Sequence, residues 1–164
     1  MVRDEEIQRL IKYAQGMGVP VRFKPYIKGS SDGGGWTVDG SEITIYVSPG
    51  DTKISKILTL IHELGHHKGF IENNREVDPK VLEALEDQDE KKRSRKRIYL
   101  DEVSDMQYWE QIYNDTNCKF DIRKLYIARD FDTWWYEELY KKDRNPTWKE
   151  KGEKLRELRN KYRK

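Results

Sequence analysis

One segment of the sequence has the apolar spacing of a buried helix, and it constrains the fold more than any other. Its aliphatic residues recur three or four positions apart, which is the repeat of one helix face. They are Ile54, Ile57, Leu58, Ile61 and Leu64. Asp51 precedes the run as a candidate N-cap, and Gly69 follows it as a candidate end. We therefore predict a buried helix between these two residues.

Before this helix the sequence predicts another helix and a small sheet. Residues 4–15 have helical apolar spacing and end at a Gly-Met-Gly sequence, so we expect an amphipathic helix there. Residues 19–23 are strand-like but are interrupted by proline. The glycine-rich residues 30–35 predict a flexible loop. Residues 36–47, with a turn at Asp39-Gly40, predict an antiparallel β-hairpin.

Downstream of the buried helix the charge pattern separates by sign. Residues 72–90 contain eight acidic and two basic side chains, whereas the next seven residues, 91–97, contain six basic side chains and no apolar one. We interpret residues 71–97 as a charged, solvated connection. Residues 98–114 and 122–142 then have the pattern of helices with bulky aromatic side chains.

Composition favours one folded domain. The chain has 164 residues, 12% of them aromatic, and a net charge of only +2, whereas disorder requires few aromatics and a large net charge. We predict a single α+β domain over residues 1–164, divided into a 1–70 part with the sheet and the buried helix, the 71–97 connection and a helical 98–164 part. Without a bilayer-spanning apolar run or a signal peptide, the chain is expected to be cytoplasmic.

The buried helix contains two histidines four residues apart, His62 and His66, with Glu63 beside the first. Residues at this spacing project from one helix face, so both imidazoles can bind one cation, and Glu63 can reach a water on that cation. Imidazole and carboxylate suit Zn²⁺, which in catalytic sites has three protein ligands and one water. Bound zinc lowers the pKa of this water toward about 7, and a general base can then remove its proton. The segment predicts a zinc hydrolase.

The sequence His62-Glu63-Leu64-Gly65-His66 matches His-Glu-x-x-His, the signature of the zincin metallopeptidases. The chain resembles the ImmA/IrrE-type peptidases, small intracellular gluzincins that are frequent in phages and mobile elements. The resemblance covers residues 1–115, where an N-terminal helix and a short sheet precede the active-site helix, as in that family. It implies a zincin-like fold and a zinc metallopeptidase that cleaves a specific protein substrate, encoded by a phage and acting in the host cell.

The resemblance also implies a third metal ligand, a carboxylate on a downstream helix. Residues 99–106 contain two adjacent acids that could serve. Glu102 is the first choice, because it has the longer side chain and is followed by Tyr108-Trp109, where the family pattern has packing residues. Asp101 fits an alternative register, in which Asp105 would hold a ligand histidine by a hydrogen bond.

Glu72 is a further alternative for the third ligand. His62, His66, Gly69 and Glu72 have the spacing of the metzincin extension, in which a turn at the glycine returns a third ligand to the metal. The fit is imperfect, because metzincins use His or Asp at that position and need a later Met-turn. His67 points about 100° away from His66, so we interpret it as a flanking residue.

Two segments are candidates for contacts with partners. The strand 43–47 is expected either to pair with an extended peptide substrate, as an edge strand, or to be internal. A last helix opens at Asn145-Pro146-Thr147, and residues 141–164 carry 11 basic and four acidic side chains. This helix could contact nucleic acid, an acidic protein or the chain's own acidic segment, but a solvated face is favoured. The competing interpretation of the chain is a metal-stabilised, catalytically inert protein-binding module of peptidase-like fold.

Overall fold

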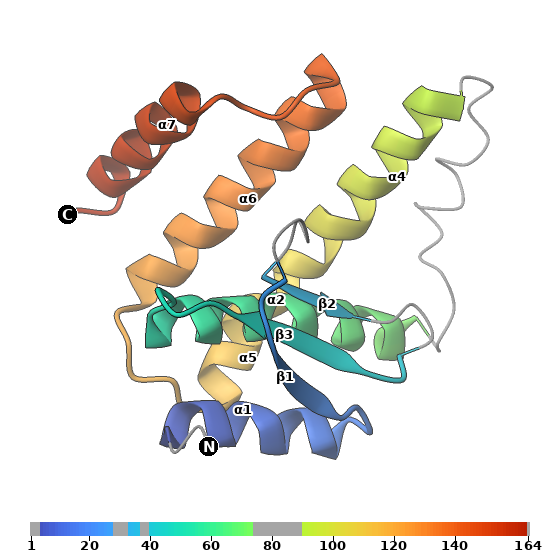
Figure 1. Ribbon diagram of the computed structural model, residues 1–164, viewed down its shortest axis with the longest axis vertical. Helices are drawn as coiled ribbons and strands as arrows, with labels where there is room; N and C mark the ends of the chain where they lie inside the picture. Colours follow the sequence, from blue (N-terminus) through green and yellow to red (C-terminus); the bar gives the residue numbers. More distant parts are fainter. Residues whose placement is uncertain (1–3, 28–32, 37–39, 74–89, 164) are drawn as a thin grey trace. The chain divides into compact units, whose positions relative to one another are not determined.

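The computed structural model describes residues 4–27, 33–36, 40–73 and 90–163. They form an α+β structure that is mostly helical, with one small mixed sheet (Figure 1). The predicted domain consists of two compact units, Met1–Glu76 with Gln107–Phe120 and Val77–Met106 with Asp121–Lys164. Within the described part of the chain, no helix has the length and apolar character needed to cross a membrane.

The first unit begins with α1, Glu5–Gly16, in agreement with the predicted helix. Asp4 is its N-cap, and the Asp4 side chain accepts a hydrogen bond from the Glu6 amide over 3.0 Å. Ile7, Leu10 and Ala14 are buried because they share one face of the helix.

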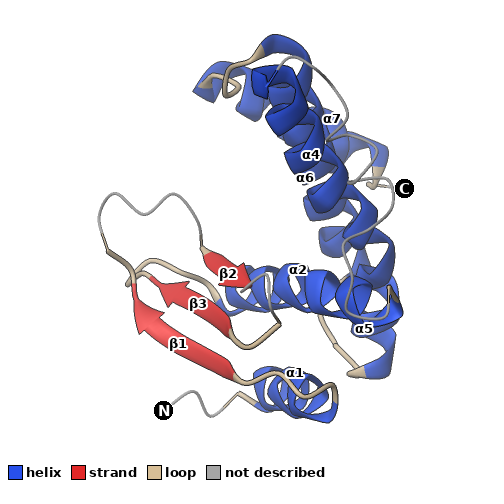
Figure 2. Cartoon of the chain, turned by 90° about the vertical axis from the view of Figure 1, so that its right-hand side faces the viewer, coloured by secondary structure: helices blue, strands red, loops and turns tan. Residues whose placement is uncertain are grey.

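The sheet of the first unit has three strands in the order β1-β3-β2 (Figure 2). The central strand β3, Ile43–Val47, is parallel to β1, Val21–Pro25, and antiparallel to β2, Gly34–Trp36. The predicted hairpin pairing is therefore confirmed. Of the two alternatives for the strand 43–47, the internal position is correct, and among the strands that the structure describes β2 lies at an edge of the sheet.

The predicted flexible loop is wrong for Gly34 and Gly35, because both belong to β2. The sequence pattern misses this strand because its order comes from pairing with β3 and from contact with a helix. A Cβ on Gly34 would lie 2.8 Å from Cγ2 of Thr59, so only glycine allows this close approach. Residues 30–32 of the predicted loop, and residues 37–39 in the predicted turn, lie outside the described residues.

The predicted buried helix is α2, Lys53–Glu72. Its N-cap is Thr52 rather than Asp51, whose carboxylate instead accepts a hydrogen bond from the Ser48 amide over 2.6 Å. The predicted end at Gly69 is wrong. Gly69 is buried inside the helix, and α2 ends at Glu72. The C-cap is Asn73, whose backbone and side-chain N–H groups both donate to the Gly69 carbonyl.

The predicted helix 98–114 is interrupted. α4, Glu90–Asp105, ends before a 3₁₀ turn at Met106–Tyr108, and α5, Trp109–Asp115, follows. In the first unit, α5 packs against α2 and buries Trp109 and Ile112. The sequence does not predict the break because the apolar spacing continues across it.

In the second unit, α6, Ile122–Lys142, packs against α4 and against α7, Trp148–Lys161. The predicted helix 122–142 is confirmed, as is the last helix, in which Thr147 and Glu150 form a capping box. The predicted solvated connection is wrong for residues 91–97, which are helical in α4. Lys and Arg favour helices, so a run without apolar residues can still be helical. Residues 74–89 of that connection lie outside the described residues.

Candidate metal centre

His62 and His66 project from one face of α2, one turn apart. Their Nε2 atoms lie 3.1 Å apart, and their ring centroids lie 4.8 Å apart. Both side chains are half-buried, so they remain accessible to an ion. In a tetrahedral zinc site with Zn–N distances of 2.0–2.1 Å, two ligand nitrogens lie about 3.3 Å apart. The two imidazoles are therefore spaced to bind a single cation.

Each of these two imidazoles contacts the ring of a different tryptophan. The His62 ring packs against Trp109 at the start of α5, with centroids 5.3 Å apart and planes inclined by 58°. The His66 ring lies over Trp36 of β2, with centroids 6.1 Å apart and planes inclined by 24°. The sequence predicts Trp36 only as part of the hairpin and Trp109 only as a packing residue, because no local spacing relates either tryptophan to the histidines.

His67 has a structural environment, in agreement with its interpretation as a flanking residue. Its ring is buried, its Nδ1 accepts a hydrogen bond from the indole N–H of Trp36 over 3.2 Å, and its Nε2 lies 3.0 Å from the carbonyl oxygen of Met17. Because a carbonyl only accepts, Nε2 carries the proton and the imidazole is assigned as neutral. Both ring nitrogens are thus engaged within the first unit, and neither is directed to a metal.

Glu63 lies between α2 and the edge strand of the sheet. The residue is 7% exposed. A Cβ on Gly34 would lie 3.0 Å from Oε1 and 3.2 Å from Cγ of Glu63, so the Glu63 side chain lies directly against the β2 backbone. The carboxyl group is therefore held against a strand that has no side chain at this point. Its predicted role as a general base stays a prediction.

Among the residues that the structure describes, His62, His66 and Glu102 form a group that could hold a metal ion. Their candidate ligand atoms all lie within 4.8 Å of one another. All three side chains are half-buried. Two imidazoles and one carboxylate are a donor set that zinc uses in catalytic sites. This group consists of the two histidines of the motif and the first-choice carboxylate.

Asp101 and Glu72, the alternative third ligands, are not part of this group. Asp101 precedes Glu102 on α4, and neighbouring helical side chains point about 100° apart. Glu72 lies about 9 Å beyond His66 along the helix axis, because α2 continues through Gly69 and the turn required by the metzincin alternative is not formed. Asp105 is the last residue of α4 and is half-buried. Its hydrogen bond to a ligand histidine stays a prediction.

Comparison with known proteins gives no relative of the chain. No protein-family model matches it, and searches of curated proteins and of solved structures likewise find no match. The resemblance to the ImmA/IrrE-type peptidases therefore depends on the His-Glu-x-x-His motif and on the order of the elements around it.

Proposed function

We propose that this chain is a zinc metallopeptidase that hydrolyses peptide bonds in a specific protein substrate. The observation that carries the proposal is the 3.1 Å separation of the His62 and His66 Nε2 atoms on one face of α2, with Glu102 as the third residue of the group that could hold a metal ion. These three residues would hold the ion. Two imidazoles and a carboxylate favour zinc over Mg²⁺ and Ca²⁺, which prefer ligand sets made of oxygen atoms.

The proposed chemistry assigns the general base to Glu63. Bound zinc would supply Lewis acidity and lower the pKa of a water molecule. Glu63 would accept the proton of this water and pass it to the leaving amine. Its carboxylate comes from the residue next to His62, and its position is restricted by burial against β2. Trp36 and Trp109 would keep the two imidazoles in their ligand orientations.

The position of β2 supports a peptide as the substrate. β2 pairs with β3 on one side, and among the described residues no strand pairs with its other side. An edge strand can bind an extended peptide through backbone hydrogen bonds, with little demand on its sequence. Because Gly34 of β2 contacts Glu63, a peptide paired with this edge would run past the proposed base.

Substitution of Glu63 by Gln tests the proposal. Gln is nearly isosteric but does not accept the proton, so we expect Glu63→Gln to retain fold and zinc and to lose about 10²- to 10⁴-fold in peptide hydrolysis. The matched control is Glu72→Gln, the same change at an exposed position of the same helix. Both variants and the unmodified chain would be incubated with bacterial proteomes, and new peptide termini would be identified by mass spectrometry.

The outcomes separate a peptidase from a catalytically inert binding module. Termini that require both Glu63 and zinc, and that the Glu72→Gln control still produces, would support the peptidase. The same termini from Glu63→Gln would exclude Glu63 as the base. If no protein produces termini that the other two do not, and the chain carries stoichiometric zinc, the metal-stabilised binding module would be favoured.

A further inference from the structure

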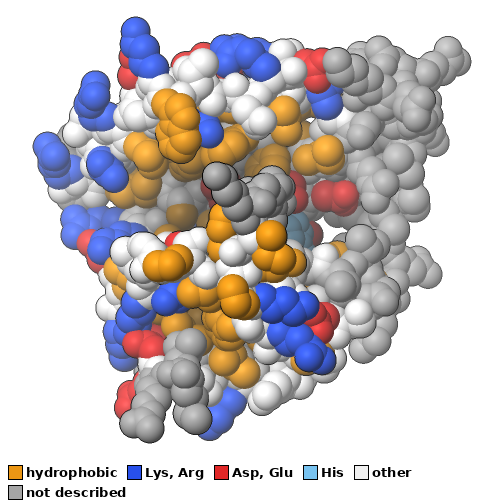
Figure 3. Space-filling view, in the orientation of Figure 1, with side chains coloured by type: hydrophobic (Ala, Val, Ile, Leu, Met, Phe, Trp, Pro, Cys, Tyr) orange, Lys and Arg blue, Asp and Glu red, His pale blue; other side chains and the backbone are white. Residues whose placement is uncertain are grey.

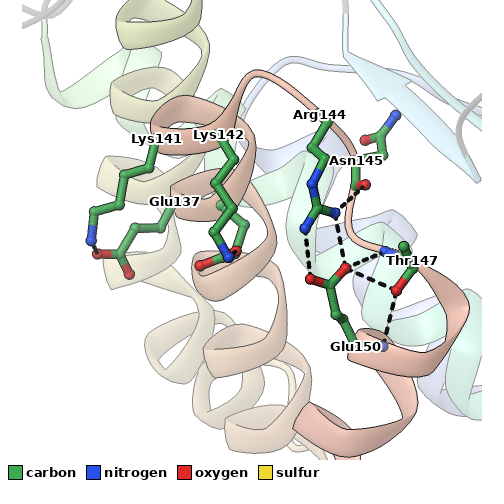
Figure 4. A network of polar contacts seen from close by, with 8 residues as sticks. Glu137, Lys141, Lys142, Arg144, Asn145, Thr147 and Glu150 are labelled. Carbon is green, nitrogen blue, oxygen red and sulfur yellow. Dashed lines mark hydrogen bonds and ion pairs between the residues drawn. The ribbon is translucent and has the colours of Figure 1, made fainter.

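Most basic side chains around the α6–α7 connection of the second unit form ion pairs. Lys141 pairs with Glu137 over 2.5 Å, and Lys142 pairs with Glu138, each one turn apart on α6. Figure 4 shows these pairs beside the Arg144–Glu150 pair. Lys154 pairs with Glu157 and Lys161 with Asp130, both over 2.8 Å. These pairs are the usual arrangement for a solvated helix surface.

A second set of basic side chains on α7 is different. Lys149, Arg156, Arg159 and Arg163 are exposed, and none of them has an ion pair within the described ranges. At 100° per residue, Lys149, Arg156 and Arg159 fall within a sector of about 80°, and Arg163 follows the C-cap of the helix. Glu153 is the one acid at the border of this sector. We call these four residues the basic stripe.

The basic stripe lies opposite the packing face of α7. Leu158 is buried, and the Tyr162 hydroxyl donates to Asp130 of α6 over 2.7 Å. Lys151 turns to the same side, with its Nζ 3.9 Å from the centroid of the Trp135 ring. Figure 3 shows Lys and Arg side chains projecting outward where α7 lies in Figure 1. The basic stripe therefore projects from the part of α7 that α6 leaves uncovered.

The residues of the basic stripe are not placed where they would all stabilise α7. Arg159 is in the last turn, where a positive charge interacts favourably with the helix dipole. Lys149 is in the first turn, where the same dipole disfavours a cation. Arg156 and Arg159 are three residues apart, so their like charges repel one another. An external anion would relieve both unfavourable arrangements.

Trp148 adds an aromatic surface beside the basic stripe. It is the first residue of α7, is 88% exposed and borders the sector that contains the stripe. Nζ of Lys151 lies 4.8 Å from the centroid of the Trp148 ring. An exposed indole on a basic helix can stack on an unpaired base while the cations of the helix contact phosphates. Bases in a duplex are already stacked and paired, so this combination fits a single strand. We propose that Trp148 and the basic stripe bind single-stranded nucleic acid, independently of the proposed metal site.

Fluorescence anisotropy with a labelled 20-residue oligothymidylate tests the proposal on the full chain. The test variant changes Lys149, Arg156 and Arg159 to Gln. The control variant changes Lys141, Lys142 and Lys154 to Gln, which removes the same charge from paired positions. If the four basic residues each contact one phosphate of a single strand, the logarithm of the binding constant should fall against the logarithm of the salt concentration with a slope of about −3. In the test variant, which loses three of these contacts, the magnitude of the slope should decrease by about 2. The control should keep most of the slope.

The indole is tested by Trp148→Ala, for which stacking on one base predicts about 5- to 150-fold weaker binding. Equal losses in the test and control variants would overturn the proposal, because net charge alone would then explain binding. The proposal would also be overturned if a duplex bound as tightly as the single strand and Trp148→Ala had no effect. It would likewise be overturned if the unmodified chain did not bind the oligonucleotide. Binding that is unchanged in His62→Ala would show that this site does not depend on the metal site.

Discussion

The indole Nε1 of Trp36 donates a hydrogen bond to Nδ1 of His67 over 3.2 Å. The same indole ring lies over the imidazole of His66. Trp36 of β2 therefore contacts two consecutive histidines of α2. These two histidines use their ring nitrogens differently. His66 keeps Nε2 directed toward His62, whereas His67 uses both of its nitrogens to connect α2 with β2 and with Met17.

This relationship predicts the effect of Trp36→Phe. Phenylalanine can still stack on His66 but has no N–H to donate, so Nδ1 of the buried His67 would lose its partner. We expect the free energy of unfolding to fall by about 1–3 kcal/mol, and zinc to be retained. Urea titration followed by circular dichroism, with zinc analysis, measures both. Trp148→Phe is the matched control and should change neither, so equal destabilisation by both would contradict this role of Trp36.

The proposed ligand set predicts which substitutions remove the metal. Protein purified in zinc-containing buffer should carry about one Zn²⁺ per chain. His62→Ala, His66→Ala and Glu102→Gln should each lose it, because two ligands hold zinc much more weakly than three. Asp101→Asn and Glu72→Gln should keep it. Metal content by mass spectrometry decides among the three acids. Stoichiometric zinc in both histidine variants would contradict the site.

The three motif residues of the site are predicted from the sequence because they depend on one helix, whereas Glu102 of α4 is predicted only from the family resemblance. His62, Glu63 and His66 have a fixed relationship once α2 forms, and the apolar spacing of α2 is unambiguous. Trp36 and Gly34 join the site through strand pairing and helix–sheet packing. Such contacts between distant parts of the chain leave no periodic signal in the sequence.

The same distinction applies to the fold. The extents of α1 and α6 follow from caps and apolar repeats, which are local. The end of α2 does not follow from such local signals. A helix can continue through a glycine when packing favours it, as α2 does at Gly69. Likewise, the highly charged residues 91–97 are helical without any apolar repeat to indicate it.

The contact between Gly34 and Glu63 predicts that Gly34→Ala impairs catalysis. The added Cβ would lie 2.8 Å from Thr59 Cγ2 and 3.0 Å from Glu63 Oε1, so the strand or the proposed base must shift. A shift of this kind can reduce turnover by about 10- to 100-fold. The matched control is Gly35→Ala, because a Cβ there meets no atom within 4 Å. Equal turnover in the two variants, with unchanged zinc content, would show that Gly34 does not position the base.

The stability of the first unit is predicted to depend on pH through Glu6. This buried carboxylate pairs with Lys53 at the start of α2 and accepts a hydrogen bond from the Lys119 amide over 2.5 Å. Burial alone would raise the pKa of Glu6, but the interactions with Lys53 and Lys119 outweigh it and lower the pKa below its ordinary value. A carboxyl group with a lowered folded-state pKa stabilises the fold above its unfolded-state pKa. This stabilisation is lost as the pH falls through the folded-state pKa.

Comparison of Glu6→Gln with the unmodified chain across pH isolates this contribution. At pH 7 the variant should be less stable by about 1.5–3 kcal/mol, the range for a hydrogen bond to a charged group. Below about pH 4 the difference should shrink, because the unmodified chain then loses the same charge. Glu5→Gln, an exposed neighbour on α1, should show no such trend. Urea titrations from pH 7 to pH 2.5 provide the measurement, and a difference that stays constant over this range would exclude the ionised Glu6 as its source.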